Sequence, residues 1–193
     1  MNALVIYAHP NPMSFNAAVV KVVQEELEKK GAMVKVKDLY AMNWNPVLSG
    51  EDFQGLHTGK VPADIKQEQA DVSWADKVVM VAPVWWHSVP AMLKGYIDRV
   101  FSIGFAYEYT QTGARGLLGG KKGLVITTSG ADEKTAQQTG MLRDLENGLV
   151  NAVFGFSGFS EFKLKNLYAI PTVSDDQRKQ MLTDVRTTIA NWA

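Results

Sequence analysis

The sequence predicts an α/β fold, a three-layer sandwich in which helices cover both faces of a five-stranded parallel sheet. Apolar runs rich in β-branched residues alternate with amphipathic segments of helical period along the chain. This alternation is typical of a parallel sheet joined by right-handed crossovers. The length of 193 residues suits one such domain, and no repeat or flexible linker divides it. We therefore expect residues 1–193 to form a single domain.

Residues 1–40 predict two strands with a helix between them. Residues 3–8 are a continuous apolar run, as expected for a strand that is covered on both faces. From Phe15 onward the apolar residues fall on one side of a helix, which Gly31 ends. Residues 34–40 alternate between apolar and polar, so this strand is expected nearer the edge of the sheet.

The middle of the chain predicts a strand between two helices. Residues 41–61 have little periodicity and are expected to be irregular. Residues 62–75 predict a helix, and residues 77–82 predict a second fully buried strand. Pro90 is favoured in the first turn of a helix, so another helix is expected to start there.

The remainder of the chain predicts the last two strands and two more helices. Residues 105–120 are expected to form a loop or hairpin, and residues 123–128 a third apolar strand. Residues 141–154 predict a helix, and residues 162–170 the last strand. Ser174 followed by Gln177 forms a capping box, which predicts the start of a final helix.

The composition excludes several classes of function. The chain has no cysteine, which rules out disulfides, Cys-ligated zinc, iron–sulfur clusters and thiol catalysis. Three histidines make a multi-histidine site improbable, and we predict no metal. The 20 basic residues balance the 20 acidic ones, which argues against nucleic-acid binding. No apolar stretch has the ~20 residues of a membrane span, and the N-terminus lacks the features of a signal peptide. We expect a cytoplasmic protein.

Three loops follow the three apolar strands, at the edge of the sheet where such folds bind ligands. They are residues 9–16, 83–88 and 127–131. The first loop leads into a helix, whose N–H groups could hold a phosphate together with Ser14 and Asn16. This loop contains no glycine, so it matches neither of the usual glycine-rich phosphate motifs. The alternative is that Ser14 or Asn16 simply caps the helix.

The other two loops suit a flat, polar-edged ligand. Trp85 and Trp86 are neighbours on the chain and point to opposite sides, so one of them is free to stack on a planar ring. The alternative is that both anchor a core or an interface. Residues 127–131 supply hydroxyls and free amides for the edge of such a ring, although an ordinary turn has the same composition. Taken together, the three loops predict a flavin nucleotide site.

Several motifs are also shared with a known family. They are His9-Pro10, Ser14-Phe15-Asn16, residues 38–43, Pro46, Gln69, Ala75-Asp76, residues 83–86, 89–96, 98–101 and 105–107, Lys121-Lys122 and residues 127–130. On these motifs the sequence resembles the NAD(P)H:quinone oxidoreductases, the DT-diaphorase-like branch of the flavodoxin-like fold. The resemblance is in register over roughly residues 3–130 and continues more loosely to the C-terminus.

The resemblance implies a homodimeric flavoprotein that takes hydride from NAD(P)H and passes two electrons to a quinone or a similar planar acceptor by a ping-pong mechanism. By position, the resemblance implies that each of the three loops binds a different part of the flavin, which is FAD or FMN. The residues implied in flavin binding are His9, Ser14, Phe15 and Asn16 at the phosphates, Pro83, Val84, Trp85 and Trp86 along the ring, and Thr127, Thr128, Ser129 and Gly130 at its edge.

The resemblance also bears on catalysis and assembly. Tyr107 and Tyr109 fall where relatives present tyrosines from the other subunit, although both could be exposed loop aromatics. Relatives of the best-known type carry a tyrosine and a histidine within the segment that corresponds to residues 131–141, and this sequence has neither. His87 is a candidate substitute, or a structural histidine at the start of a helix. We further expect Trp44 and Trp74 to contribute to a dimer surface.

Other functions are compatible with the same sequence features. A reductase of nitro or azo compounds would differ only in the acceptor. A regulatory flavoprotein, such as the partners of ion-efflux systems that resemble this family, would need no turnover. A one-electron flavodoxin usually has a strongly acidic surface, and the zero net charge disfavours it. The choice between NADH and NADPH stays open.

Overall fold

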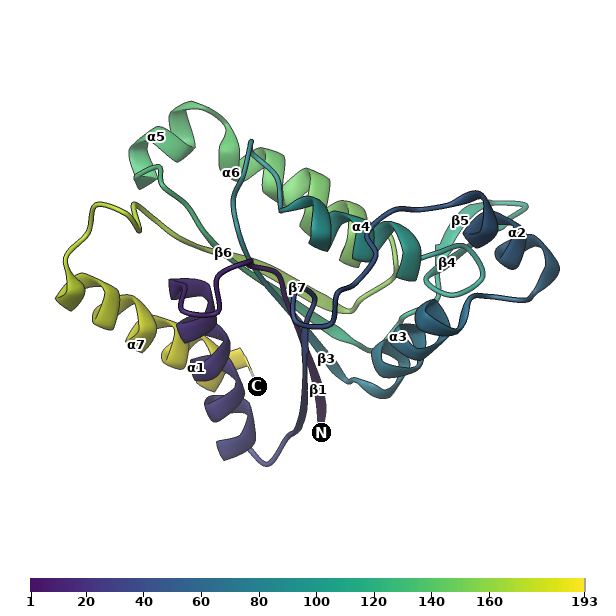
Figure 1. The fold of residues 1–193 in the computed structure, drawn as a ribbon, viewed down its shortest axis with the longest axis horizontal. Helices are drawn as coiled ribbons and strands as arrows, with labels where there is room; N and C mark the ends of the chain where they lie inside the picture. Colours follow the sequence, from purple (N-terminus) through teal and green to yellow (C-terminus); the bar gives the residue numbers. More distant parts are fainter. Residues whose placement is uncertain (193) are drawn as a thin grey trace.

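The computed structural model describes residues 1–192 and has the predicted three layers (Figure 1). Its central sheet has five parallel strands in the order β2-β1-β3-β6-β7. The strands are β1 (Asn2–Tyr7), β2 (Met33–Asp38), β3 (Lys77–Pro83), β6 (Lys122–Thr128) and β7 (Glu161–Leu167). The chain adds strands on one side of β1 and then on the other, so the order reverses between β1 and β3. The flavodoxin-like architecture is therefore confirmed.

Successive residues of the central strands face opposite layers of the core. Ala3 and Val5 pack with α1 (Phe15–Lys29) and α7 (Asp175–Trp192) on one face of the sheet. Leu4 and Ile6 pack with α3 (Ala63–Trp74), α4 (Ala91–Val100) and the helix that precedes β7 on the other. Because side chains alternate along a strand, a run that is apolar throughout must be covered on both sides. The apolar runs are the three central strands, as expected.

Two helical segments differ from the sequence prediction. Residues 41–61, expected to be irregular, contain α2 (Gly50–Thr58). A capping box between Ser49 and Asp52 begins this helix, and Gly59, with φ of +71°, ends it. The residue types at both ends are typical helix start and stop signals, so the sequence contained evidence for α2. The single helix expected at 141–154 is α6 (Met141–Leu145) followed by the π-helix η1 (Glu146–Gly155). A short helix α5 (Glu133–Gln138) precedes them.

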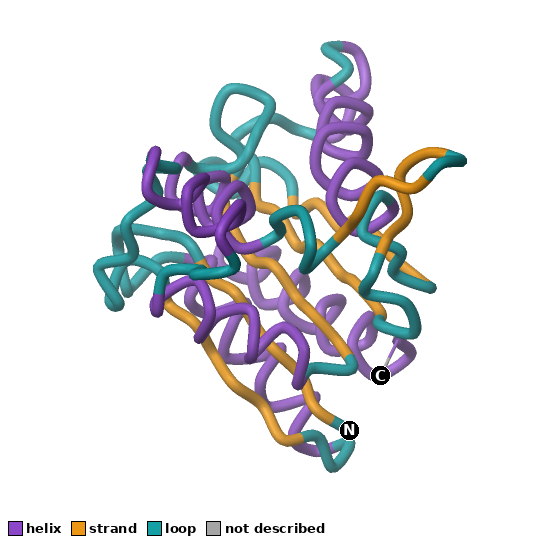
Figure 2. Tube along the Cα trace, turned by 90° about the vertical axis from the view of Figure 1, so that its right-hand side faces the viewer, coloured by secondary structure: helices purple, strands orange, loops and turns teal. Residues whose placement is uncertain are grey.

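The excursion at residues 105–120 is a hairpin. Strands β4 (Tyr107–Thr110) and β5 (Gly113–Gly116) pair antiparallel and project from the body of the molecule (Figure 2). The helix expected at Pro90 begins one residue later, with Pro90 as its N-cap. The capping box at Ser174 and Gln177 is confirmed by hydrogen bonds in both directions.

Helix α4 holds the segment that contains α2 against the body. Arg99 is only 5% exposed, and its Nε and Nη2 donate to the two carboxylate oxygens of Asp52 at 2.9 and 3.0 Å. Its Nη1 donates to Asp64 at 2.7 Å and to the Asn45 carbonyl at 3.0 Å. The guanidinium also lies over the ring of Trp44, which is buried. Trp44 therefore belongs to the core of the chain and not to the dimer surface on which we expected it.

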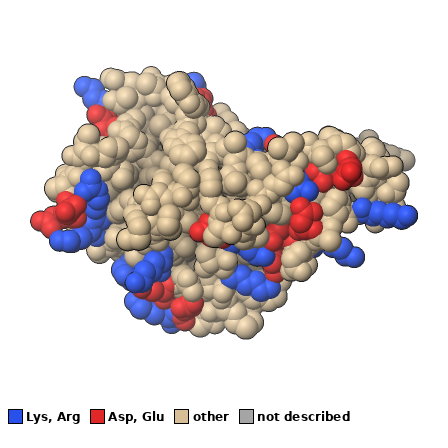
Figure 3. Space-filling view, in the orientation of Figure 1, with Lys and Arg blue, Asp and Glu red and all other residues tan. Residues whose placement is uncertain are grey.

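The surface carries mixed charge. Lys and Arg side chains lie among Asp and Glu side chains over the face of the molecule in Figure 3. Within the described residues, no helix is both long and apolar enough to cross a bilayer.

Candidate functional site

A hollow of ≈ 260 Å³ lies at the carboxyl ends of β1, β3 and β6, where the strand order reverses. Open α/β sheets bind their ligands at this position because loops from neighbouring strands diverge there. The hollow is lined by His9, Ser14, Phe15, Asn16, Pro83, Val84, Trp85, Thr128, Ser129, Gly130, Ile170 and Pro171. The structure thus brings together residues of all three predicted loops.

Two of the predicted residues do not line the hollow. Thr127 is fully buried, and its hydroxyl donates to Asn166 Oδ1 at 2.8 Å. Asn166 in turn donates to Ser129 Oγ at 3.0 Å, so Thr127 reaches the hollow only through these neighbours. Trp86 is 99% exposed, and this excludes the alternative that it anchors the core of the chain.

Two lining residues were missed by the sequence analysis. They are Ile170, expected as the last residue of the final strand, and Pro171, which follows it; β7 ends earlier, at Leu167. Ala169 then adopts φ of +55°, and the Ile170 N–H donates to the Ser129 carbonyl at 3.0 Å. The chain consequently turns toward the loop after β6. The topology could have predicted their place in the site, because β7 is parallel to the other strands and its carboxyl end lies at the same edge of the sheet.

The first loop directs hydrogen-bond donors into the hollow. Ser14 caps α1, and its Oγ accepts from the Ala17 N–H at 3.2 Å. Because α1 begins at Phe15, the N–H groups of Phe15 and Asn16 have no acceptor within the helix. His9 Nδ1 accepts from the Asn11 N–H at 3.0 Å, so the proton of neutral His9 is on Nε2. Burial raises the pKa of Tyr7, whose hydroxyl is 3.1 Å from Ser14 Oγ.

Asn16 is the buried polar residue of the site. It is 3% exposed, and its Nδ2 donates to Thr128 Oγ1 at 2.9 Å, which connects α1 to the end of β6. Its Oδ1 is buried without a hydrogen-bond partner. A buried amide oxygen left in this state costs about 1–3 kcal/mol, and such groups are rare in native proteins. A ligand that donates to this oxygen would remove the cost.

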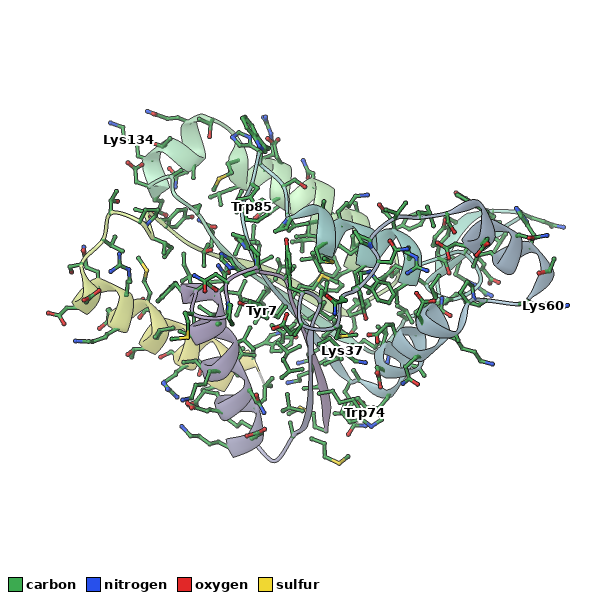
Figure 4. The ribbon with its side chains drawn as sticks, viewed as in Figure 1. Tyr7, Lys37, Lys60, Trp74, Trp85 and Lys134 are labelled. Atoms are coloured by element: carbon green, nitrogen blue, oxygen red, sulfur yellow. The ribbon has the colours of Figure 1, made fainter. Side chains whose placement is uncertain are left out.

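The second loop ends in a strained turn. The N–H of Trp85 donates to the Ser88 carbonyl at 2.8 Å, and the N–H of Ser88 donates back at 3.0 Å. The two residues between them, Trp86 and His87, have φ of +53° and +58°. Two consecutive positive φ values define a type I′ turn, which normally requires Asn and Gly. Trp85 lies above the start of α1 on the chain that rises from β3 (Figure 4), with its ring 6.4 Å from that of His9.

The candidate catalytic residues lie outside the hollow. His87 Nδ1 is 2.9 Å from Asp144 Oδ2 on α6. Tyr107 and Tyr109 are on the β4–β5 hairpin, with ring centroids 5.8 Å apart. Tyr107 lines a separate apolar hollow of ≈ 400 Å³ between α2 and α4, and Tyr109 is 69% exposed. Neither tyrosine reaches the hollow of its own chain.

The chemistry of the lining favours an anion with an aromatic ring. The lining residues include no carboxylate, lysine or arginine, so N–H donors and the positive end of α1 dominate the potential. Among residues 1–192, no group of three His, Asp or Glu side chains could hold a metal ion.

Comparisons with known proteins agree with the fold. Residues 1–189 match a family described as having a flavodoxin-like fold. The chain is 37% identical over 183 residues to an NAD(P)H oxidoreductase of Haemophilus influenzae, covering 94% of this chain and 91% of that protein. It is 34% identical to ribosyldihydronicotinamide dehydrogenase [quinone] of Pongo abelii, over 93% of this chain and 86% of the relative. The NAD(P)H:quinone oxidoreductase of Methanothermobacter marburgensis superposes with a TM-score of 0.90 at 27% identity, covering 100% of this chain and 96% of that one.

Proposed function

Because this chain belongs to the NAD(P)H oxidoreductases of flavodoxin-like fold, we propose that the hollow at the strand-order reversal holds a flavin, FAD or FMN. The reaction is the transfer of a hydride from NAD(P)H, through that flavin, to a quinone or a similar planar acceptor. The observation that carries the proposal is the buried Oδ1 of Asn16, an acceptor without a donor at the start of α1. A flavin brings a phosphate for the N–H groups at that helix end, and the hydroxyl groups between its phosphate and its ring can donate to a buried acceptor.

Different residues of the hollow would contact different parts of the flavin. The N–H groups of Phe15 and Asn16 and the Nε2–H of His9 would hold the phosphate. Pro83, Val84 and Trp85 would cover the ring, and residues 128–130 would bond its polar edge. Thr127 would act through Asn166, which fixes Ser129.

The bound flavin supplies the two-electron chemistry that no side chain of this protein can supply. The chain orients the ring, shields one side of it from water with Trp85, and stabilises developing negative charge with fixed N–H donors. One open face would serve NAD(P)H and the acceptor in turn, which predicts ping-pong kinetics.

The cofactor content tests the proposal. Purified protein is expected to be yellow and to release one flavin per chain, whose mass distinguishes FAD from FMN. Steady-state plots of NAD(P)H against benzoquinone should give parallel lines. A colourless protein that takes up neither flavin on titration would overturn the proposal, and a semiquinone that dominates reductive titration would point to a one-electron carrier.

We also expect the protein to be a homodimer. Phe53 lines the apolar hollow between α2 and α4 and is 52% exposed, and Tyr109 on the β4–β5 hairpin is 69% exposed. Exposed aromatic surface of this kind is typical of a subunit interface. Sedimentation equilibrium should give twice the mass of the chain, and Tyr109→Ser should raise the dissociation constant. A fully active monomer at micromolar concentration would contradict this expectation.

A further inference from the structure

The contact between His87 and Asp144 links the strained turn to helix α6. Their Nδ1 and Oδ2 atoms are 2.9 Å apart across 57 residues of sequence, and each side chain is 44% exposed. A carboxylate only accepts hydrogen bonds, so the proton of this contact is on Nδ1 of His87. The Nε2 atom is left on the opposite edge of the ring. His9 has the reverse arrangement, because its Nδ1 accepts from a backbone N–H.

This contact lies beside the flavin hollow. His87 is in the same four-residue turn as Trp85, which lines the hollow. Figure 1 shows the chain after β3 running beside α6 before it enters α4. Val84 lines the hollow and also packs on the apolar cluster of α5 and α6. Helix α6 is therefore a wall next to the mouth of the hollow.

The backbone of the turn supports a function for its side chains. Trp86 and His87 both adopt positive φ, a conformation that L-residues rarely hold and that persists where the surroundings impose it. Here those surroundings are the two backbone hydrogen bonds between Trp85 and Ser88 and the contact with Asp144. A turn that served only to reverse the chain would carry Asn and Gly at these positions.

We propose that His87 donates the proton that accompanies hydride transfer to the acceptor, and that Asp144 is the positioning residue that fixes its ring. This inference rests on the proposed function. A quinone that receives a hydride on one carbonyl oxygen needs one further proton on the other to become a hydroquinone. His87 supplies that proton from Nε2 as imidazolium, becomes neutral, and regains a proton from water because it is half-exposed.

The charged groups that the structure places at this contact are few. Asp144 Oδ2 faces His87, and Arg143 Nε is 4.0 Å from Asp144 Oδ1. The carboxylate fixes the orientation of the His87 ring by accepting from Nδ1, whereas Arg143 is 75% exposed and well screened by water.

The test compares two acceptors that differ in their need for a proton. Benzoquinone takes up protons on reduction, and ferricyanide takes up only electrons. Asp144→Asn and His87→Gln should lower kcat with benzoquinone about tenfold or more. Turnover with ferricyanide and the Kd for flavin should stay within about twofold. Asp98→Asn is the matched control, because Asp98 is an exposed carboxylate paired with Lys94.

A spectroscopic measurement separates positioning from general damage. Long-range ¹H–¹⁵N spectra should show the Nδ1–H tautomer for neutral His87 and the Nε2–H tautomer for His9. Asp144→Asn should shift the His87 signals toward a mixture and leave those of His9 unchanged. Equal losses with both acceptors, or no loss with benzoquinone, would overturn the role of this pair while flavin binding stands. A wild-type protein that takes up no flavin would overturn the pair and the proposed function together.

Discussion

Replacing Arg99 by methionine is expected to lower the free energy of unfolding by about 3–5 kcal/mol. The methionine keeps most of the side-chain volume but leaves Asp52, which is 2% exposed, without its bidentate partner. The cost arises mainly from the uncompensated buried carboxylate. Urea denaturation followed by circular dichroism measures it.

Arg186 provides the matched control. It also contacts two carboxylates, those of Glu25 and Glu26, but its side chain is 39% exposed. Arg186→Met should therefore cost only about 0–1 kcal/mol. Adding Asp52→Asn to Arg99→Met should recover part of the loss, because the buried charge is removed. If both substitutions lowered the free energy of unfolding equally, the ion pairs of Arg99 would stabilise the fold no more than an exposed salt bridge does.

Acid unfolding gives a second measure of the same cluster. The hydrogen bonds from Arg99 hold the pKa of Asp52 below its ordinary value. A carboxyl whose pKa is lowered in the folded state stabilises the protein above its unfolded pKa of about 3.9, and that contribution is lost as the pH falls through the folded value. Arg99→Met should flatten the dependence of stability on pH in this acidic range.

Replacing Trp85 by alanine is expected to weaken flavin binding by about tenfold or more, since a lost aromatic stack costs roughly 1–3 kcal/mol. Trp85 lines the hollow, and its exposed fraction of 43% leaves one side of the indole free to contact a ligand. Trp86→Ala is the paired variant, because it removes the same indole one residue later. Fluorescence titration of apo-protein with flavin gives both dissociation constants.

The two tryptophan variants also separate binding from folding. Trp86 is 99% exposed, so its removal should change the stability of apo-protein by less than about 0.5 kcal/mol. If Trp86→Ala weakens flavin binding more than Trp85→Ala, Trp86 turns inward when flavin binds. A large loss of apo-protein stability in either variant would instead indicate a core role.

The architecture could be predicted from the sequence because the same pattern, an apolar strand followed by an amphipathic helix, recurs along the chain. Three strands that are apolar on both faces require helices on both sides of the sheet. Parallel strands place their carboxyl ends at one edge, so the meeting of the three loops also followed from the pattern. Helix α2 was missed because its evidence is a single capping box and one glycine, without a long amphipathic face.

The details of the site depend on contacts that local patterns do not contain. Which indole enters the hollow depends on positive φ at Trp86 and His87, and closure of that turn fixes both. Ile170 reaches the site because Ala169 also adopts positive φ. The contact of His87 with Asp144 joins residues that are 57 positions apart, so only the fold reveals it.

The turn at Trp86 and His87 also bears on how this protein would respond to engineering for heat resistance. Two L-residues in the left-handed region cost on the order of 1–3 kcal/mol each, while a whole domain is stable by only about 5–15 kcal/mol. Asn and Gly at these positions would recover that free energy without disturbing the sheet. A selection for thermostability alone would therefore favour changes at this turn, and each would discard an aromatic ring or an imidazole beside the hollow. Libraries that keep residues 85–88 fixed should retain turnover at a lower melting temperature.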